Sequence, residues 1–314
     1  MAAKREIYLA GGCFWGVEHF FKGVDGVSEL LPGYANGHTE HPAYEDVYTD
    51  RTGHAETVRV CYDPEKVSLQ TILRLFFIIV DPLSVNRQGP DTGTRYRSGV
   101  FYTDERERPV IEAAFRAVEA RLGQPVVTQL EPLRCFFPAE DYHRQYLEKN
   151  PGGYCHLPLK AFRYLRLWQD IGLFLGEEAD PIARMADTAA LIRERMGFFW
   201  TGFYRVCGQQ LVLGPFQGDA ACLRIGYGKG VCGSAWKERK TLVVPDVEQF
   251  PGHIACSALS RSEIVVPLFG SDGRVLAVLD IDSEQPATFD EDDAAWLELI
   301  AESVLAGADE KLFG

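Results

Sequence analysis

A glycine-rich cysteine motif near the start of the chain constrains the local fold more than any other feature of this sequence. Residues 11–16 read Gly-Gly-Cys-Phe-Trp-Gly, directly after the apolar segment 7–10. Because glycine permits a tight turn and a close backbone approach, the pattern predicts a strand, a sharp turn at Cys13 and a helix over about 15–21. The free N–H groups and the positive dipole end of such a helix favour the thiolate form of cysteine.

The residues alone leave two interpretations of Cys13. As a nucleophile, it has Phe14 and Trp15 beside it to enclose an apolar group bonded to sulfur. As a structural residue, it is a buried thiol in a tight turn, since free cysteine is among the most buried residue types.

Composition and charge narrow the class of protein. The chain has 314 residues, of which 46% are hydrophobic and 25% charged, which suits two globular domains. A net charge of −13 argues against nucleic acid as a partner, because non-specific binding needs a basic surface. The most apolar run, residues 75–80, is too short for a membrane span, and we see no signal peptide. We therefore expect a cytoplasmic protein whose eight cysteines are thiols at rest.

Strand and helix patterns alternate along the first half. Period-two alternation predicts a strand over 55–62, Ser68 is placed to cap a helix over 69–80, and Pro109 suits the first turn of a long helix. We expect a loop at 32–37. This alternation predicts a layered α/β or α+β domain.

A change of composition between residues 158 and 181 marks the expected domain boundary. We place the two domains at 1–165 and 166–314. In the second domain, helices are expected at 182–196 and 291–305. Strand-like runs lie between them, at residues 198–206, 210–213, 241–244, 263–268 and 275–281.

Six short motifs run in order through the first half. They read Gly-Cys-Phe-Trp-Gly at 12–16, Gly-Tyr-Ala at 33–35, Gly-His-Ala-Glu at 53–56, Asn-Arg-Gln-Gly at 86–89, Tyr-Arg-Ser at 96–98 and Gly-Tyr-Cys at 153–155. Together they resemble an A-class peptide methionine-S-sulfoxide reductase over about residues 5–160. The resemblance implies a mixed-sheet domain with helices that reduces methionine-S-sulfoxide, both in proteins and as the free amino acid.

The resemblance also implies a role for each motif residue. Cys13 is the nucleophile, Cys155 the resolving cysteine and Glu56 the acid, whose half-buried position predicts a raised pKa. Taken without the motif, Glu56 would be an ordinary solvated strand carboxylate. The implied substrate-binding residues are Phe14 and Trp15 around the methyl group, and Tyr44, Tyr96 and Asp91 at the sulfoxide oxygen.

Cysteines and carboxylates also gather in the second half. Read from the residues alone, Cys222, Cys232, His253 and Cys256 form a loosely spaced zinc set without paired ligand motifs. The carboxylates are Glu263 and the pair Asp280 and Asp282, which share one face of a predicted strand. Crowded carboxylates can bind an ammonium group and keep one acid protonated.

Motifs again decide between these interpretations. They are Trp-Thr-Gly-Phe-Tyr at 200–204, Leu-Gly-Pro-Phe-Gln-Gly at 213–218, Gly-Lys-Gly-Val-Cys-Gly at 228–233, Phe-Pro-Gly-His-Ile-Ala-Cys at 250–256, Ser-Arg-Ser-Glu at 260–263 and Leu-Asp-Ile-Asp-Ser at 279–283. Over about 170–308 they resemble a free methionine-R-sulfoxide reductase, a GAF-fold enzyme with an antiparallel sheet and flanking helices. The resemblance implies that Cys256 attacks, Cys222 closes the disulfide and Cys232 assists. The residues implied to bind the substrate are Trp200, Tyr204, Glu263, Asp280 and Asp282.

We therefore predict an α+β (α/β layered) chain of two thiol-dependent reductases. The expected substrates are oxidised proteins and free methionine sulfoxide, with thioredoxin as electron donor. We expect neither a metal nor another bound cofactor, and a homodimer through the GAF-like domain. The alternative is an S-sulfoxide reductase whose GAF domain is a non-catalytic ligand or redox sensor.

Overall fold

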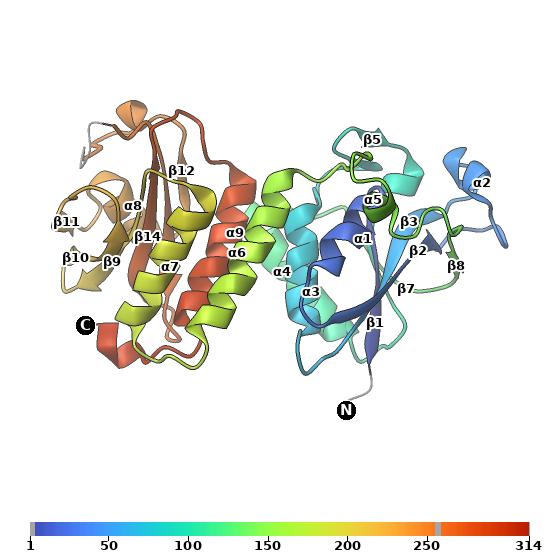
Figure 1. The fold of residues 1–314 in the computed structure, drawn as a ribbon, viewed down its shortest axis with the longest axis horizontal. Helices are drawn as coiled ribbons and strands as arrows, with labels where there is room; N and C mark the ends of the chain where they lie inside the picture. Colours follow the sequence, from blue (N-terminus) through green and yellow to red (C-terminus); the bar gives the residue numbers. More distant parts are fainter. Residues whose placement is uncertain (1–3, 255–258, 314) are drawn as a thin grey trace. The chain divides into compact units, whose positions relative to one another are not determined.

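The structure is a computed structural model that describes residues 4–254 and 259–313. The chain forms two compact units, residues 1–162 and 163–314. The expected boundary between residues 165 and 166 falls inside helix α6, Leu159–Leu175. The predicted α+β class is confirmed, since each unit combines one large sheet with helices (Figure 1).

A six-stranded mixed sheet organises the first unit. Its strand order is β7-β6-β1-β3-β2-β8, with β6 and β7 parallel and every other neighbouring pair antiparallel. The strands are β1 (Arg5–Gly11), β2 (Val27–Ala35), β3 (Ala55–Tyr62), β6 (Ser98–Tyr102), β7 (Gln129–Pro132) and β8 (Phe136–Pro138). The strand predicted over 55–62 is β3, and its apolar residues Val58 and Val60 are fully buried.

Three helices of the first unit begin within one residue of their predicted starts, and two short ones, α2 and α5, were not predicted. Ser68 caps α3, because its side chain accepts a hydrogen bond from the Thr71 N–H at 3.0 Å. Pro109 lies in the first turn of α4. The helices are α1 (Phe14–Lys22), α2 (Tyr44–Tyr48), α3 (Leu69–Ile79), α4 (Arg108–Leu122) and α5 (Tyr146–Lys149), and a small hairpin joins β4 (Arg87–Gln88) to β5 (Asp91–Thr92).

The loop expected at 32–37 is partly wrong, because its first four residues extend β2. Pro32 lacks an N–H, but its carbonyl accepts a hydrogen bond from the Ala139 N–H at 2.9 Å. Gly33 allows β8 to come close, since a Cβ there would lie 2.5 Å from the Phe137 carbonyl oxygen. The Pro-Gly pair therefore marks a close strand contact here and not a turn.

An antiparallel six-stranded sheet forms the centre of the second unit. Its order is β11-β10-β9-β14-β13-β12, and all five neighbouring pairs are antiparallel. The strands are β9 (Trp200–Cys207), β10 (Gln210–Gln217), β11 (Arg224–Gly226), β12 (Leu242–Val244), β13 (Ser262–Phe269) and β14 (Val275–Ser283). All five predicted strands are present, and β11 was not predicted.

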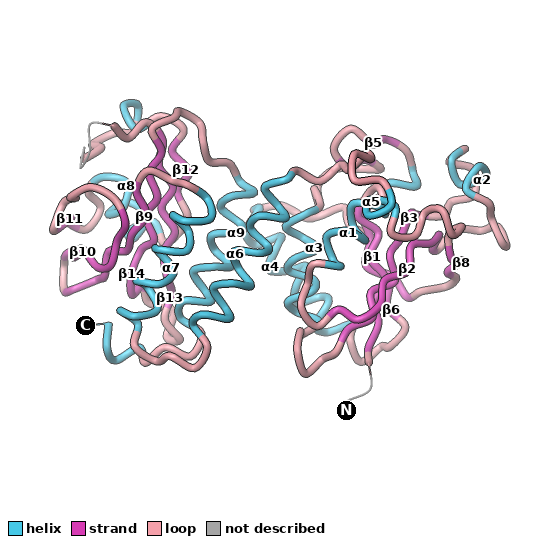
Figure 2. Tube along the Cα trace, in the orientation of Figure 1, coloured by secondary structure: helices cyan, strands magenta, loops and turns pink. Residues whose placement is uncertain are grey.

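Long helices flank this sheet (Figure 2). α7 (Pro181–Met196) packs on β9 and β10, and α9 (Glu291–Leu305) packs on β13. The ring of Tyr164 on α6 stacks with that of Trp296 on α9, their centroids 5.9 Å apart. A short helix that the sequence analysis missed, α8 (Gly230–Glu238), packs on β13 and β14 and carries Cys232. No helix formed by residues 4–254 and 259–313 is both long and apolar enough to span a membrane.

Candidate active sites

Cys13 lies at the junction of β1 and α1, in the position that the sequence predicted. It is the residue before the first turn of α1 and is only 5% exposed. Gly12 before it has a φ of +82°, and a Cβ there would lie 2.6 Å from the Gln88 side chain. This position therefore needs glycine for both its conformation and its space.

The protonation of Cys13 differs from the sequence expectation. Burial raises the pKa of the thiol well above its usual value, and the neighbouring Glu56 raises it further. The N–H groups of Trp15 and Gly16 lower that pKa, as the helix argument expected, but they do not outweigh burial. The expected thiolate is thus wrong for Cys13, because desolvation exceeds the effect of the helix N-terminus.

Glu56 is a buried residue of β3, and its carboxyl lies next to the first residue of α1. It is 2% exposed, and its Oε2 accepts a hydrogen bond from the Phe14 N–H at 3.1 Å. Burial raises its pKa to about 8, although that hydrogen bond acts in the opposite direction. The carboxyl is therefore largely protonated at neutral pH and can donate a proton, in line with the direction expected from sequence.

Two phenols lie around this carboxyl. Burial and then the charge of Glu56 raise the pKa values of Tyr44 and Tyr96, that of Tyr96 to about 12. Both phenols thus remain hydrogen-bond donors at any physiological pH. The Arg95 guanidinium lies 4.4 Å from the centre of the Tyr96 ring and pairs with Asp50 at 2.9 Å, and the sequence analysis assigned no site role to either.

The aromatic enclosure predicted from Phe14 and Trp15 is larger than the motif suggested. Trp15 stacks on Tyr146, with centroids 3.8 Å apart, and its Nε1 donates to His143 Nδ1 at 3.1 Å. Phe14 is buried, and its ring lies 6.0 Å from that of Tyr34.

Sequence reasoning missed a carboxylate that is hydrogen-bonded to two residues of this aromatic enclosure. Glu140 accepts hydrogen bonds from the Tyr34 hydroxyl at 2.7 Å and from the Tyr44 N–H at 2.9 Å. The available signal was the aromatic cluster at residues 142–146 directly after Glu140, whose pairing with residues about a hundred positions away no local pattern reveals.

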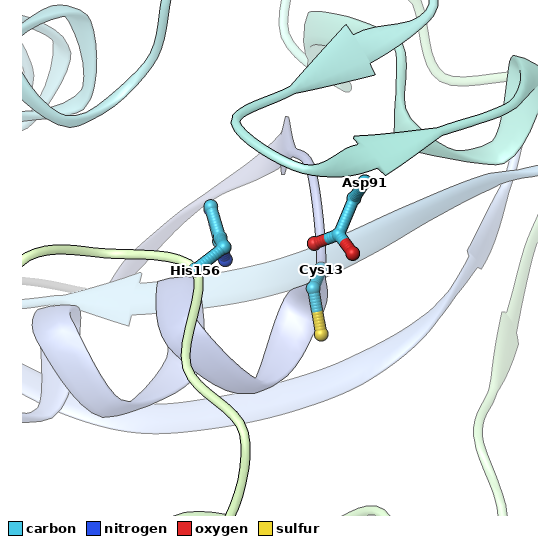
Figure 3. A group of neighbouring side chains, drawn as sticks. All are labelled: Cys13, Asp91 and His156. Atoms are coloured by element: carbon cyan, nitrogen blue, oxygen red, sulfur yellow. The ribbon is translucent and has the colours of Figure 1, made fainter.

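Three side chains from separate segments converge at the nucleophile (Figure 3). Cys13 Sγ, a carboxylate oxygen of Asp91 and a ring nitrogen of His156 all lie within 4.8 Å of one another. Asp91 comes from β5, and burial together with the neighbouring Asp91 raises the pKa of the Tyr154 phenol. Cys155 is a half-buried free thiol, and its Sγ lies 3.4 Å from where a Cβ on Gly16 would be. The structure thus brings all predicted residues of the first site into one region.

The second site is a pocket between β13, β14 and the start of α8. It is lined by Ile225, Gly230, Val231, Cys232, His253, Ile254, Ser260, Glu263, Asp280 and Asp282. The sheet register places Glu263 opposite Asp282, and Val265 opposite Asp280, so the three carboxyls share one face. Cys232 Sγ lies 3.8 Å from Glu263 Oε1.

These three carboxyls do not ionise alike. Burial and then the charge of the neighbouring carboxyls raise the pKa values of Glu263 and Asp280 well above the usual range. Burial raises that of Asp282 to about 6, against a hydrogen bond from Ser260 that lowers it. At pH 7 Asp282 is therefore mostly ionised, whereas burial and the neighbouring carboxyls favour the protonated form of Glu263 and Asp280. Cys232 beside them is a thiol, since burial raises its pKa.

The other residues predicted for the second site do not line this pocket in the described structure. Trp200 and Tyr204 belong to the packed core next to the pocket and are not among its lining residues. Trp200 stacks on Phe216 at 5.5 Å, and its Nε1 donates to the Asp219 carbonyl at 3.0 Å. Cys256, the predicted nucleophile, lies outside the described residues.

The cysteines also bear on the metal alternative. Cys222 is disulfide-bonded, whereas the sequence predicted thiols at rest, and in this oxidised state its sulfur is not available as a zinc ligand. Within the described part of the chain, only two groups bring three possible metal-ligand atoms within 4.8 Å of one another. The first is Cys13, Asp91 and His156, and the second is Cys232, Glu263 and Asp280. Each contains a cysteine to which the motifs give a role in thiol chemistry, and we assign neither group to a metal.

The two units thus define a thiol oxidoreductase with two separate cysteine sites. The family model for peptide methionine sulfoxide reductase matches residues 5–169, and a GAF domain model matches residues 180–306. The chain belongs to the peptide methionine sulfoxide reductase family and carries a GAF domain after the reductase.

Individual proteins resemble each half. The peptide methionine sulfoxide reductase MsrA of Clostridium botulinum is 49% identical over 155 residues, which are 49% of this chain and 99% of that protein. The structure of Mxr1 from Saccharomyces cerevisiae is 36% identical over 50% of this chain and 93% of its own, with a TM-score of 0.48. The free methionine-R-sulfoxide reductase of Neisseria meningitidis is 51% identical over 48% of this chain and 87% of its own, with a TM-score of 0.45.

Proposed function

We propose that the first unit reduces methionine-S-sulfoxide, in proteins and as the free amino acid, by a relay from Cys13 to Cys155. The observation that carries this proposal is Glu56, a buried acid with a pKa of about 8 beside the nucleophile. Glu56 and the phenols of Tyr44 and Tyr96 donate hydrogen bonds to the sulfoxide oxygen. Phe14 and Trp15 enclose the S-methyl group.

The first step transfers oxygen with all atoms accounted for. The Cys13 thiol attacks the sulfoxide sulfur, and its proton and the oxygen end together as a sulfenic acid on Cys13 while methionine leaves. Because sulfoxide oxygen gains negative charge as its bond weakens, a protonated Glu56 stabilises the transition state more than the ground state. A charged Glu56 would instead oppose the reaction.

Thioredoxin is the proposed electron donor for both sites. In the first unit, Cys155 attacks the sulfenic acid to form a disulfide with Cys13, which a protein dithiol then reduces. Cys155 is half-buried in a segment with two glycines, 152 and 153. Such a relay needs a reducing compartment, so we propose that the protein acts in the cytoplasm.

The second unit is proposed to reduce free methionine-R-sulfoxide, with Cys256 as nucleophile and Cys222 as its disulfide partner. Its small acidic pocket supports a free amino acid as substrate, because Asp282 is ionised and can hold an ammonium group. The protonated pair Glu263 and Asp280 can donate to the sulfoxide oxygen. The epimer assigned to each site and a homodimer through this unit rest on the family resemblance alone.

One experiment tests both assignments. Turnover of free and peptide-bound methionine sulfoxide, each as the S and R epimer, is measured for the wild type, Cys13→Ser and Cys256→Ser. We expect Cys13→Ser to lose only S-epimer reduction and Cys256→Ser to lose only free R-epimer reduction. A second unit that binds free methionine sulfoxide but never turns it over would instead support the sensor alternative.

A further inference from the structure

His156 lies at the first site, and neither the motifs nor the proposed steps give it a task. One of its ring nitrogens lies within 4.8 Å of Cys13 Sγ and of a carboxylate oxygen of Asp91. It follows Cys155 directly in the sequence, and both side chains contact the same glycine. A Cβ on Gly16 would lie 2.8 Å from His156 Nδ1 and 3.4 Å from Cys155 Sγ. The imidazole is therefore next to both sulfurs of the proposed disulfide.

The hydrogen bonds of His156 define its tautomer. Nε2 lies 3.1 Å from the Gly11 carbonyl oxygen. A carbonyl only accepts, so Nε2 carries the hydrogen and Nδ1 of the neutral ring has a free lone pair. Nδ1 is buried and has no hydrogen-bond partner, and burial lowers the pKa of the ring, which keeps it neutral.

A buried nitrogen without a hydrogen-bond partner costs stability, so its presence in a native fold calls for an explanation, of which a catalytic role is one. Here it faces chemistry that needs a proton acceptor. Burial raises the pKa of Cys155, so this residue is a thiol at neutral pH, whereas only a thiolate attacks a sulfenic acid effectively. The hydroxide released from that acid also needs a proton.

We propose that His156 carries the proton of the resolving step. Nδ1 takes the proton of the Cys155 thiol while the Cys155 sulfur forms its bond to Cys13 Sγ. The S–O bond of the Cys13 sulfenic acid breaks, and the departing hydroxide receives the proton from Nδ1 and leaves as water. The Cys13 sulfur is reduced, the Cys155 sulfur is oxidised, and imidazole is regenerated. The Asp91 carboxylate stabilises the imidazolium form between the two transfers.

This proposal rests on the relay from Cys13 to Cys155, and the test separates the two. One equivalent of methionine-S-sulfoxide is mixed with the reduced protein, and samples are quenched over time. Released methionine reports the first step, and thiol alkylation followed by mass spectrometry reports the Cys13–Cys155 disulfide. The variants are His156→Gln, His156→Ala, Cys155→Ser and, as a control, His19→Gln on the exposed face of α1.

His156→Gln distinguishes proton transfer from a structural role. Its amide can still donate to the Gly11 carbonyl, but it cannot act as a base. We expect methionine release at the wild-type rate and disulfide formation slowed by roughly 10²- to 10⁴-fold, the usual range for general acid–base catalysis. Higher pH should restore the rate in this variant, because it ionises Cys155 directly, and added imidazole should restore it in His156→Ala. The His19→Gln control should match the wild type in both steps.

Two possible results would overturn different parts of the proposal. A wild-type rate of disulfide formation in His156→Gln, with or without a defect in His156→Ala, would overturn the proton-transfer role. A Cys155→Ser variant that still turns over with thioredoxin would instead overturn the relay itself, whatever the His156 variants do.

Discussion

Each of the two sites places proton donors near a buried thiol, but the sets of acidic side chains differ. In the first unit, one buried carboxyl, Glu56, lies beside two phenols and an aromatic enclosure. In the second unit, three carboxyls share one face of the sheet, and one of them, Asp282, is ionised at neutral pH. Both sites keep protonated acid near a buried thiol.

The difference lies in what each site recognises. The first site has aromatic side chains for an S-methyl group, and its carboxylate Asp91 is assigned to the sulfoxide oxygen and not to an ammonium group. That arrangement does not require a free α-amino group, so it suits methionine sulfoxide within a peptide as well as the free amino acid. The second site has a negative charge in a small pocket, which suits a free amino acid. Burial of carboxyls supplies the acid in both cases, and the second site adds the ionised carboxylate of Asp282, which suits an ammonium group.

The largest expected difference between the sites concerns Glu56. Glu56→Gln should slow methionine release from the S epimer by roughly 10²- to 10⁴-fold in a single turnover, because the amide cannot donate a proton to the sulfoxide oxygen. Reduction of free methionine-R-sulfoxide should be unchanged, since the second site has its own acids.

A matched control for this variant is available in the same unit. Glu107 is also a buried carboxyl with a pKa raised by burial, and it accepts a hydrogen bond from Tyr62, but it is not part of the site. Glu107→Gln should keep the wild-type rate. Equal rates in Glu56→Gln and Glu107→Gln would remove the acid role from Glu56.

Asp282 tests the other half of the comparison. Asp282→Asn removes the charge proposed to hold the ammonium group, and hydrogen bonds to charged groups contribute about 1.5–3 kcal/mol. We expect KM for free methionine-R-sulfoxide to rise by about 10- to 150-fold, while S-epimer reduction stays constant. Asp272→Asn, an exposed carboxylate in the turn between β13 and β14, is the control. A KM that does not change would show that the ammonium group is bound elsewhere.

Local patterns predicted the elements that hold these residues, but not their partners. Cys13 and Glu56 were assigned correctly to a helix start and a strand because glycine turns and period-two alternation are local signals. His143, Glu140 and His156 were missed because they reach the site through contacts more than 90 residues apart in sequence. The thiolate expected for Cys13 failed for a related reason, since a dipole argument uses local structure and the larger desolvation effect depends on the whole fold.

The two sites should also respond to pH in opposite directions. Glu56 has a pKa of about 8 and acts in its protonated form. Because the first step moves the thiol proton onto oxygen and releases none, its single-turnover rate should fall as pH rises above 8. Asp282 has a pKa of about 6 and acts in its ionised form. The KM of the second site should therefore rise as pH falls below 6. A first-step rate that increases through pH 8 would mean that the reactive form has already lost a proton.

The smallest predicted effect concerns Ser260, a buried hydroxyl that tunes Asp282. Burial raises the pKa of Asp282, and the hydrogen bond from Ser260 lowers it. Ser260→Ala removes that bond, worth about 1 kcal/mol, so the pKa should rise by roughly 0.7 of a unit. The rise of KM for free methionine-R-sulfoxide at acid pH should therefore begin at a pH higher by that amount. The fall of the first-step rate above pH 8 at the first site should be unchanged. Ser271→Ala, in the exposed turn after β13, is the matched control. A shift to lower pH, or an equal shift in the control, would show that Ser260 does not stabilise the ionised form of Asp282.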